Sequence, residues 1–178
     1  MGLKVSFELD DDDLEHFRLI MLHARDTAAG RSPEQIVATA NTLLDEIDAK
    51  RVPGFISDRL QKLRLMMQMI SDIEWRLPHN EVKRVLNALA YFTDPDDLIP
   101  DEIPGLGYLD DAIMIELVLR ELVHEIEAYD EFCSFRELLP SKTAAQLTTK
   151  RDDLMQRMLD RRQQDLEKDS EAGVRLLD

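Results

Sequence analysis

Apolar residues recur every three or four positions through most of this chain, and this spacing constrains its fold more than any other feature. The segment after residues 10–13 shows it first, with Leu14, Phe17 and Met21 on one side of a predicted helix that ends near Gly30. The composition agrees, because 44% of the residues are hydrophobic but only 6% are aromatic, as is usual in helical proteins. The sequence therefore predicts an all-α protein.

Proline, glycine and capping residues divide this pattern into separate helices. The clearest start is Ser32, which is followed by Pro33 at the first helical position and by Gln35 at the position that completes a capping box. The pairs Pro53-Gly54 and Leu77-Pro78 bound a long helix, since the residue before a proline disfavours helical geometry. Later helices are expected at about 80–89, 112–126, 132–139 and 141–168. We predict a compact bundle of about six or seven helices, with a structured connector rich in proline and aspartate between two core helices.

Charge is distributed unevenly along the chain, whose formal net charge is -15. Residues 1–140 carry 29 acidic and 14 basic side chains, whereas residues 141–178 carry eight of each. We therefore predict an acidic all-α domain at 1–140 and a polar C-terminal helical arm at 141–178, whose last ten residues fray. The apolar stripe of the arm is narrow and interrupted by Arg162, so the arm is expected to lie on the body or to join a second copy.

The acidic body limits the partners and the location of the chain. An anionic surface repels phosphate backbones and anionic lipid headgroups, so we expect no nucleic acid partner and no electrostatic docking to a membrane. The single cysteine, Cys133, cannot form an intrachain disulfide. No apolar run approaches the roughly 20 residues that a spanning helix needs. We expect a soluble, cytoplasmic protein without a transmembrane segment.

The connector at residues 94–111 is the most specific motif of the chain, with three prolines, two glycines and six aspartates. Its pattern resembles that of the YkvA-like family, a numbered domain of unknown function, over roughly residues 82–122. The matching residues are Pro95, Asp97, Leu98, Ile99, Pro100, Asp101, Ile103, Pro104, Gly107, Leu109, Asp110 and Asp111. Many family members have apolar residues at the positions of Asp96 and Glu102, and hydrophobic flanks that suggest membrane association. These two carboxylates make insertion into a bilayer costly, so this chain looks like a soluble relative.

The connector aspartates have two interpretations. Asp110 and Asp111 suit the first turn of the following helix, where the helix dipole favours anions, and a similar role suits the acids after Asp94. Alternatively, Asp97, Asp101, Asp110 and Asp111 converge on a hard cation such as Mg²⁺ or Ca²⁺, which prefers oxygen ligands. Asp111 favours a partner of some kind, since it projects on the same helical stripe as Val118 and Leu122, about two and three turns later.

Other motifs are weaker. Glu121 and His124 have a spacing used in helical metal sites, but projection places them with Arg120 and Glu125 on a polar surface face. No set of residues predicts a catalytic site. The sequence therefore favours a non-enzymatic protein-interaction or scaffold domain that contacts a protein partner or itself. A metal-dependent hydrolase that uses the connector aspartates and a peripheral membrane protein are the alternatives.

Overall fold

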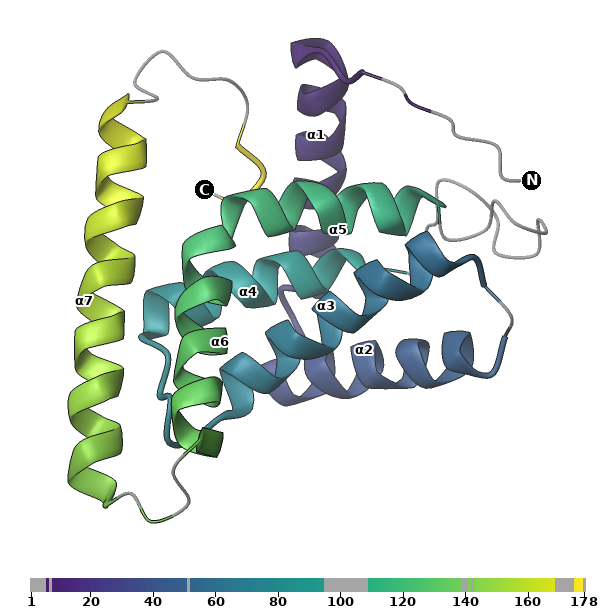
Figure 1. Cartoon of the computed structure of the whole chain (residues 1–178). Coiled ribbons are helices and arrows are strands. Elements are labelled where there is room, and N and C mark those ends of the chain that lie inside the picture. The colour runs from purple at the N-terminus through teal and green to yellow at the C-terminus, as the bar shows by residue number, and fades with distance from the viewer. Residues whose placement is uncertain are drawn as a thin grey trace.

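Seven helices make up the part of the chain that the structure describes (Figure 1). The computed structural model describes residues 6, 8–50, 52–94, 109–138, 141, 143–168 and 175–177. The helices are α1 (Asp11–Ala28), α2 (Pro33–Asp48), α3 (Gly54–Ser71), α4 (His79–Tyr91), α5 (Leu109–Glu121), α6 (Val123–Leu138) and α7 (Ala144–Lys168). The predicted all-α class is confirmed. Most of the connector, residues 95–108, lies outside the described residues.

Local side-chain bonds start the first two helices where the sequence predicts. The Asp10 carboxylate accepts from the Asp13 amide at 3.0 Å, and Asp13 accepts in return from the Asp10 amide. Ser32 and Gln35 form the same reciprocal pair, with Pro33 at the first helical position. Each capping box satisfies backbone N–H groups that a helix start leaves without partners.

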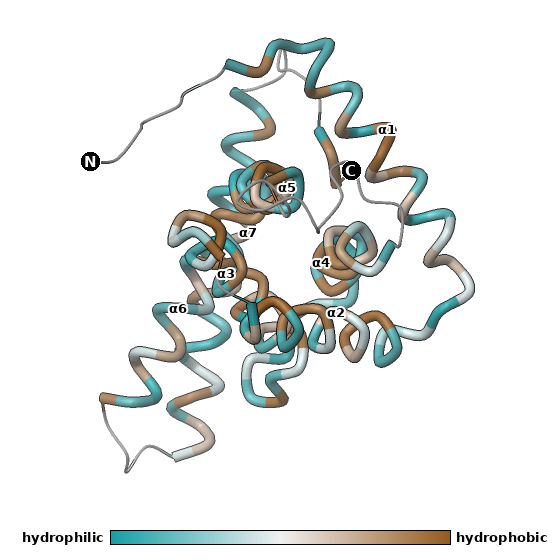
Figure 2. The backbone as a smooth tube through the Cα atoms, turned by 90° about the vertical axis from the view of Figure 1, so that its right-hand side faces the viewer, coloured by the Kyte–Doolittle hydropathy of each residue, from teal (hydrophilic) through white to brown (hydrophobic). Residues whose placement is uncertain are grey.

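The helices pack around α3, α4 and α5, and Figure 2 shows α4 and α5 nearly end-on at the centre of the molecule. α1 and α2 contact α4, while α3 contacts α5 and α6. α7 runs along α6 at one edge of the molecule (Figure 1). The methionines of α3 fill the core, since Met66, Met67 and Met69 are all buried.

The helix predicted at 112–126 is wrong in its extent. α5 ends at Glu121, and α6 starts at Val123 in a new direction (Figure 1). Leu122 at this corner is fully buried, and the change of direction lets both helices pack against α3. The short helix expected after Phe132 is the second half of α6.

The turn between α3 and α4 is held by Asp72. Its Oδ1 accepts from the amides of Glu74 and Trp75 at 2.9 and 3.1 Å, while Oδ2 accepts from the Tyr129 hydroxyl and from Arg136. Burial disfavours the ionised form, but these hydrogen bonds together lower the pKa of Asp72. The turn thereby fixes Trp75, which is completely buried.

Candidate functional site

The structure describes two of the four aspartates predicted to bind a metal. Asp110 and Asp111 lie in the first turn of α5 and are 4% and 7% exposed. Asp97 and Asp101 lie outside the described residues. Asp111 does face the buried side, as the stripe that it shares with apolar residues of α5 predicts. Within the described ranges, no three His, Cys, Asp or Glu side chains lie close enough together to hold a metal ion.

A cavity of about 590 Å³ adjoins Asp111 and the end of α4. Asp94, Glu46 and Arg31 also line it, and Arg31 donates from Nη1 to the carbonyl of Thr93 at 3.0 Å. Two of the connector's carboxylates therefore line a hollow next to α2 that has both polar and apolar walls.

A second cavity, of about 560 Å³, lies between α1, α3 and α5. We call it the α1/α3/α5 groove. Its apolar residues are Leu9, Leu14, Phe55, Leu109, Ala112, Ile113 and Leu117. Phe55 is 46% exposed although it is a large aromatic side chain. The groove therefore presents apolar surface that solvent reaches.

Charged side chains border this groove on two sides. On one side Glu116 pairs with Arg59 at 3.6 Å and with Arg120 at 3.7 Å. On the α1 side, Glu8 lines the groove, and the exposed acids of residues 10–13 follow it along the chain. The groove thus has a border of both charges on α3 and α5 and the carboxylate of Glu8 just before α1.

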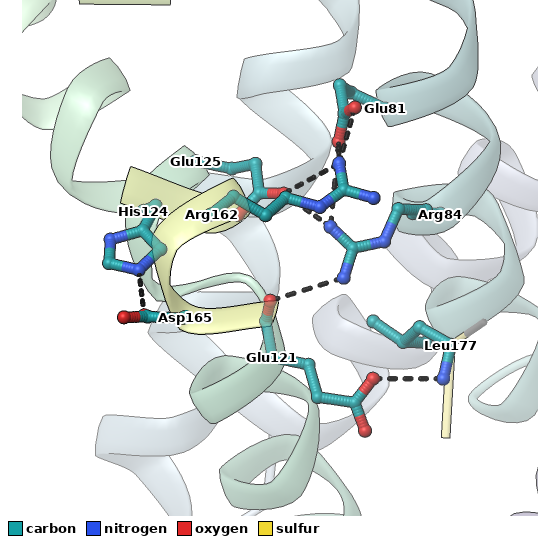
Figure 3. A network of polar contacts seen from close by, with 8 residues as sticks. All are labelled: Glu81, Arg84, Glu121, His124, Glu125, Arg162, Asp165 and Leu177. Carbon is teal, nitrogen blue, oxygen red and sulfur yellow. Dashed lines mark hydrogen bonds and ion pairs between the residues drawn. The ribbon is translucent and has the colours of Figure 1, made fainter. Parts of the chain in front are cut away.

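A network of buried charges joins α4, α6 and α7 (Figure 3). Arg84 of α4 bonds to Glu125 of α6 and lies 3.5 Å from Glu81. Arg162 of α7 donates to both carboxylate oxygens of Glu81 at 2.5 Å and lies 3.7 Å from Glu125. Two carboxylates and two guanidinium groups therefore balance one another beneath the arm.

The burial of this network corrects the surface position expected for Glu121, His124 and Glu125. Glu125 is fully buried, and the His124 side chain is only 18% exposed, because α7 covers this face of α6. Burial raises the pKa of Glu125, although Arg84 opposes the shift. A helical projection cannot show that a distant helix covers a polar face.

A row of ion pairs extends along the contact between α6 and α7, and we call it the α6/α7 ladder. Glu131 accepts from Lys150 at 2.6 Å and from Arg157 at 3.0 Å. Glu127 pairs with Arg161 at 3.4 Å. The basic residues of the neutral arm therefore face acidic residues of the body.

At the end of the ladder the acidic residue belongs to α7, and its partner on α6 is a histidine. His124 Nε2 lies 2.5 Å from Asp165 Oδ2, and this hydrogen bond lowers the pKa of Asp165. Close by, the Glu121 carboxylate accepts from the amides of Leu176 and Leu177 at 2.5 and 3.0 Å. These two leucines belong to the tail that was expected to fray, and both are buried.

Sequence reasoning did not find this network, although one signal for it was present. Arg162 interrupts the apolar stripe of the arm, and a charge at such a position requires a buried partner. Its partners Glu81 and Glu125 are distant along the chain. The spacing of residues along the sequence does not predict that Glu81 and Glu125 are the partners of Arg162.

Comparison with known proteins shows which family this chain resembles and over which residues. The family model described as "Protein of unknown function (DUF1232)" matches residues 84–117, from α4 through the connector into α5. The chain is also 34% identical over 79 residues to the uncharacterized membrane protein YkvA of Bacillus subtilis, a match that covers 41% of this chain and 73% of YkvA. The chain belongs to the DUF1232 family. The resemblance predicted from the connector is thereby confirmed.

The DUF1232 segment contributes to the groove and to the buried network. It supplies Arg84 to the buried network and the apolar residues Ala112, Ile113 and Leu117 to the groove. No solved structure matches the chain. Among the described residues, no helix combines the length and the apolar character needed to cross a bilayer.

Proposed function

We propose that this DUF1232 protein is a non-enzymatic, cytoplasmic interaction module that binds a basic amphipathic helix of a partner protein in the α1/α3/α5 groove. The observation that carries the proposal is the groove itself, an apolar hollow of about 560 Å³ in which Phe55 remains 46% exposed. Such hollows commonly receive the apolar face of a helix, with aromatic side chains contributing much of the affinity.

Charge favours a basic occupant over an acidic one. The chain carries a net charge of -15, and Glu8 lines the groove on its α1 side, whereas Arg59 and Arg120 on the other side are paired with Glu116. A helix with lysine or arginine beside its apolar face pairs with this border, whereas an acidic helix meets like charge.

Fluorescence anisotropy with two labelled peptides tests the proposal. Both peptides are amphipathic helices of about 18 residues with leucine on one face, long enough to form a helix on binding. One carries lysine on its polar face and the other glutamate. We expect the lysine peptide to bind with a Kd of about 10 µM and the glutamate peptide to bind at least about tenfold more weakly.

Two variants with exposed apolar positions locate the binding. Phe55→Ser should weaken binding of the lysine peptide by about tenfold, because it removes an aromatic contact of the groove. Leu19→Ser is the matched control, since Leu19 is 54% exposed on α1 and is not part of the groove. Equal binding to both variants would exclude the groove as the site, and no binding to the wild type would exclude the proposal.

The YkvA relative favours a second candidate, contact with a membrane, because its name describes a membrane protein. Co-sedimentation with zwitterionic phosphatidylcholine vesicles tests it without electrostatic attraction. Pelleting that persists in high salt would support this candidate, and a chain that stays in the supernatant at low salt would exclude it.

The predicted cation site is a separate proposal. Asp110 and Asp111 are buried at the start of α5, and with Asp97 and Asp101 they would give a set of oxygen ligands suited to Mg²⁺ or Ca²⁺. Millimolar Mg²⁺ or Ca²⁺ should then raise the Tm of the wild type by linkage, and Asp111→Asn should abolish the rise. An unchanged Tm with both ions would remove the site and, with it, the metal-dependent hydrolase.

A further inference from the structure

The arm docks on the body through both apolar and charged contacts. Among the 25 residues of α7, the buried side chains are Leu154, Met155 and Met158. In contrast, the Arg162 pair with Glu81 and the α6/α7 ladder connect the length of the helix to α4 and α6. Arg151 adds bonds from Nε to the Trp75 carbonyl and from Nη2 to the Arg76 carbonyl, at 2.7 and 2.5 Å. The acidic side chains of α4 and α6 therefore bind the basic side chains on one face of α7.

The position of α7 allows this surface to be used by another chain. α7 lies at the edge of the molecule beside α6 (Figure 1), and residues 139–143, which include Pro140, form its connection to α6. The contacts of α7 with the body involve side chains and do not depend on which chain supplies the helix. Exchange of an identical element between two copies can therefore remake all of them.

We propose that the acidic face of α4 and α6 accepts α7 from a second copy of this chain, so that two chains exchange their arms. Charge complementarity identifies α7 as the helix that fits this face. Lys150 and Arg157 of α7 pair with Glu131, and Arg161 pairs with Glu127. Arg162 pairs with the buried Glu81 and lies near Glu125. The groove between α1, α3 and α5 takes no part, so this proposal is independent of the proposed function.

Protein concentration determines whether a chain binds its own arm or exchanges arms with a second copy. A short connection gives the chain's own arm an effective concentration in the millimolar range. The wild type should therefore exchange arms when it is highly concentrated, whereas two different chains whose arms are each repelled by their own body and attracted by the other's should exchange at much lower concentration.

A pair of charge-reversed full-length variants tests the exchange. One variant carries Glu127→Arg and Glu131→Arg on α6, and the other carries Lys150→Glu, Arg157→Glu and Arg161→Glu on α7. Each variant alone places like charges across its ladder, but each arm matches the body of the other variant. All five positions are partly exposed, and both variants keep a net negative charge, so general attraction between them is absent.

Light scattering coupled to size-exclusion chromatography measures the molecular mass of each variant and of their mixture. Each variant alone should have the mass of one chain, 20.6 kDa, and the equimolar mixture should have twice that mass. A mixture that keeps the mass of one chain would overturn the proposal. Circular dichroism of each variant alone checks that its helices remain folded.

The wild type provides a second measurement that does not depend on the variants. Lys150 Nζ and Glu131 Oε1 are 2.6 Å apart, close enough for a carbodiimide to join them as an amide with loss of water. In a concentrated mixture of ¹⁴N and ¹⁵N chains, arm exchange should produce cross-linked peptides that contain both isotopes. Cross-links confined to one isotope at millimolar concentration would overturn the proposal.

Discussion

Replacing Arg162 with methionine removes one of the two positive charges that balance the buried carboxylates of Glu81 and Glu125. In the wild type, Arg162 Nη1 contacts both oxygens of Glu81 at 2.5 Å, and the side chains of Glu81 and Glu125 are 6% and 1% exposed. In the variant, Arg84 alone faces two buried carboxylates. Methionine keeps much of the aliphatic volume, so the change reports mainly on charge.

The loss of folding stability in Arg162→Met follows from the burial of Glu81 and Glu125. Breaking a buried ion pair from one side destabilises a protein by about 3–5 kcal/mol. Because the Arg162 side chain is itself 23% exposed, we expect the lower end, about 3 kcal/mol, for Arg162→Met. For a chain of this size, that corresponds to a Tm lower by about 6–12 °C.

Arg161→Met is the matched control, one residue away on the same helix. Arg161 and its partner Glu127 are 56% and 57% exposed, and their atoms lie 3.4 Å apart. An exposed pair of this kind contributes about 0.5 kcal/mol or less, so the Tm should fall by no more than about 2 °C.

The pH dependence of the Tm of Arg162→Met shows whether the variant is destabilised by the unbalanced carboxylates or by the loss of side-chain packing. Burial already raises the pKa of Glu125, and loss of Arg162, which lies 3.7 Å away, should raise the pKa of Glu125 further in the folded state. The folded state then binds protons more tightly than the unfolded state, so stability falls as pH rises through this range. The Tm deficit of Arg162→Met should therefore be smaller at about pH 5 than at about pH 8. Equal deficits for the two variants, or a deficit that does not change with pH, would refute the reasoning.

Two further predictions concern contacts outside the ladder. Glu121→Gln should speed amide hydrogen exchange at Leu176 and Leu177, because it weakens the charged acceptor of both N–H groups; unchanged protection of these two amides would contradict the contact. Asp72→Asn removes a carboxyl group whose pKa is lowered in the folded state, so the stabilisation is present above the ordinary aspartate pKa and is lost as pH falls through the folded value. Urea unfolding should show a gap between wild type and Asp72→Asn that narrows below about pH 4, and a constant gap would argue against an ionised Asp72.

The parts of this protein that sequence alone determined are those that depend on nearby residues. The capping boxes that begin at Asp10 and Ser32 each need one partner three positions away, and the helical period alone directs Asp111 toward the core. The connector motif was likewise enough to identify the DUF1232 family, because its residues are contiguous.

Only the tertiary structure determined the corner between α5 and α6 and the burial of the charged network. Both depend on how the helices are oriented relative to one another. The change of direction at Leu122 arises because α5 and α6 both pack on α3, and no local signal marks it. Glu125 and Arg84 are 41 positions apart, and Arg162 and Glu81 are 81 positions apart. Whether such charges are exposed or buried depends on which helix covers them. Helical period shows that a face is polar, but only packing shows that α7 supplies the charges that make this face stable when buried.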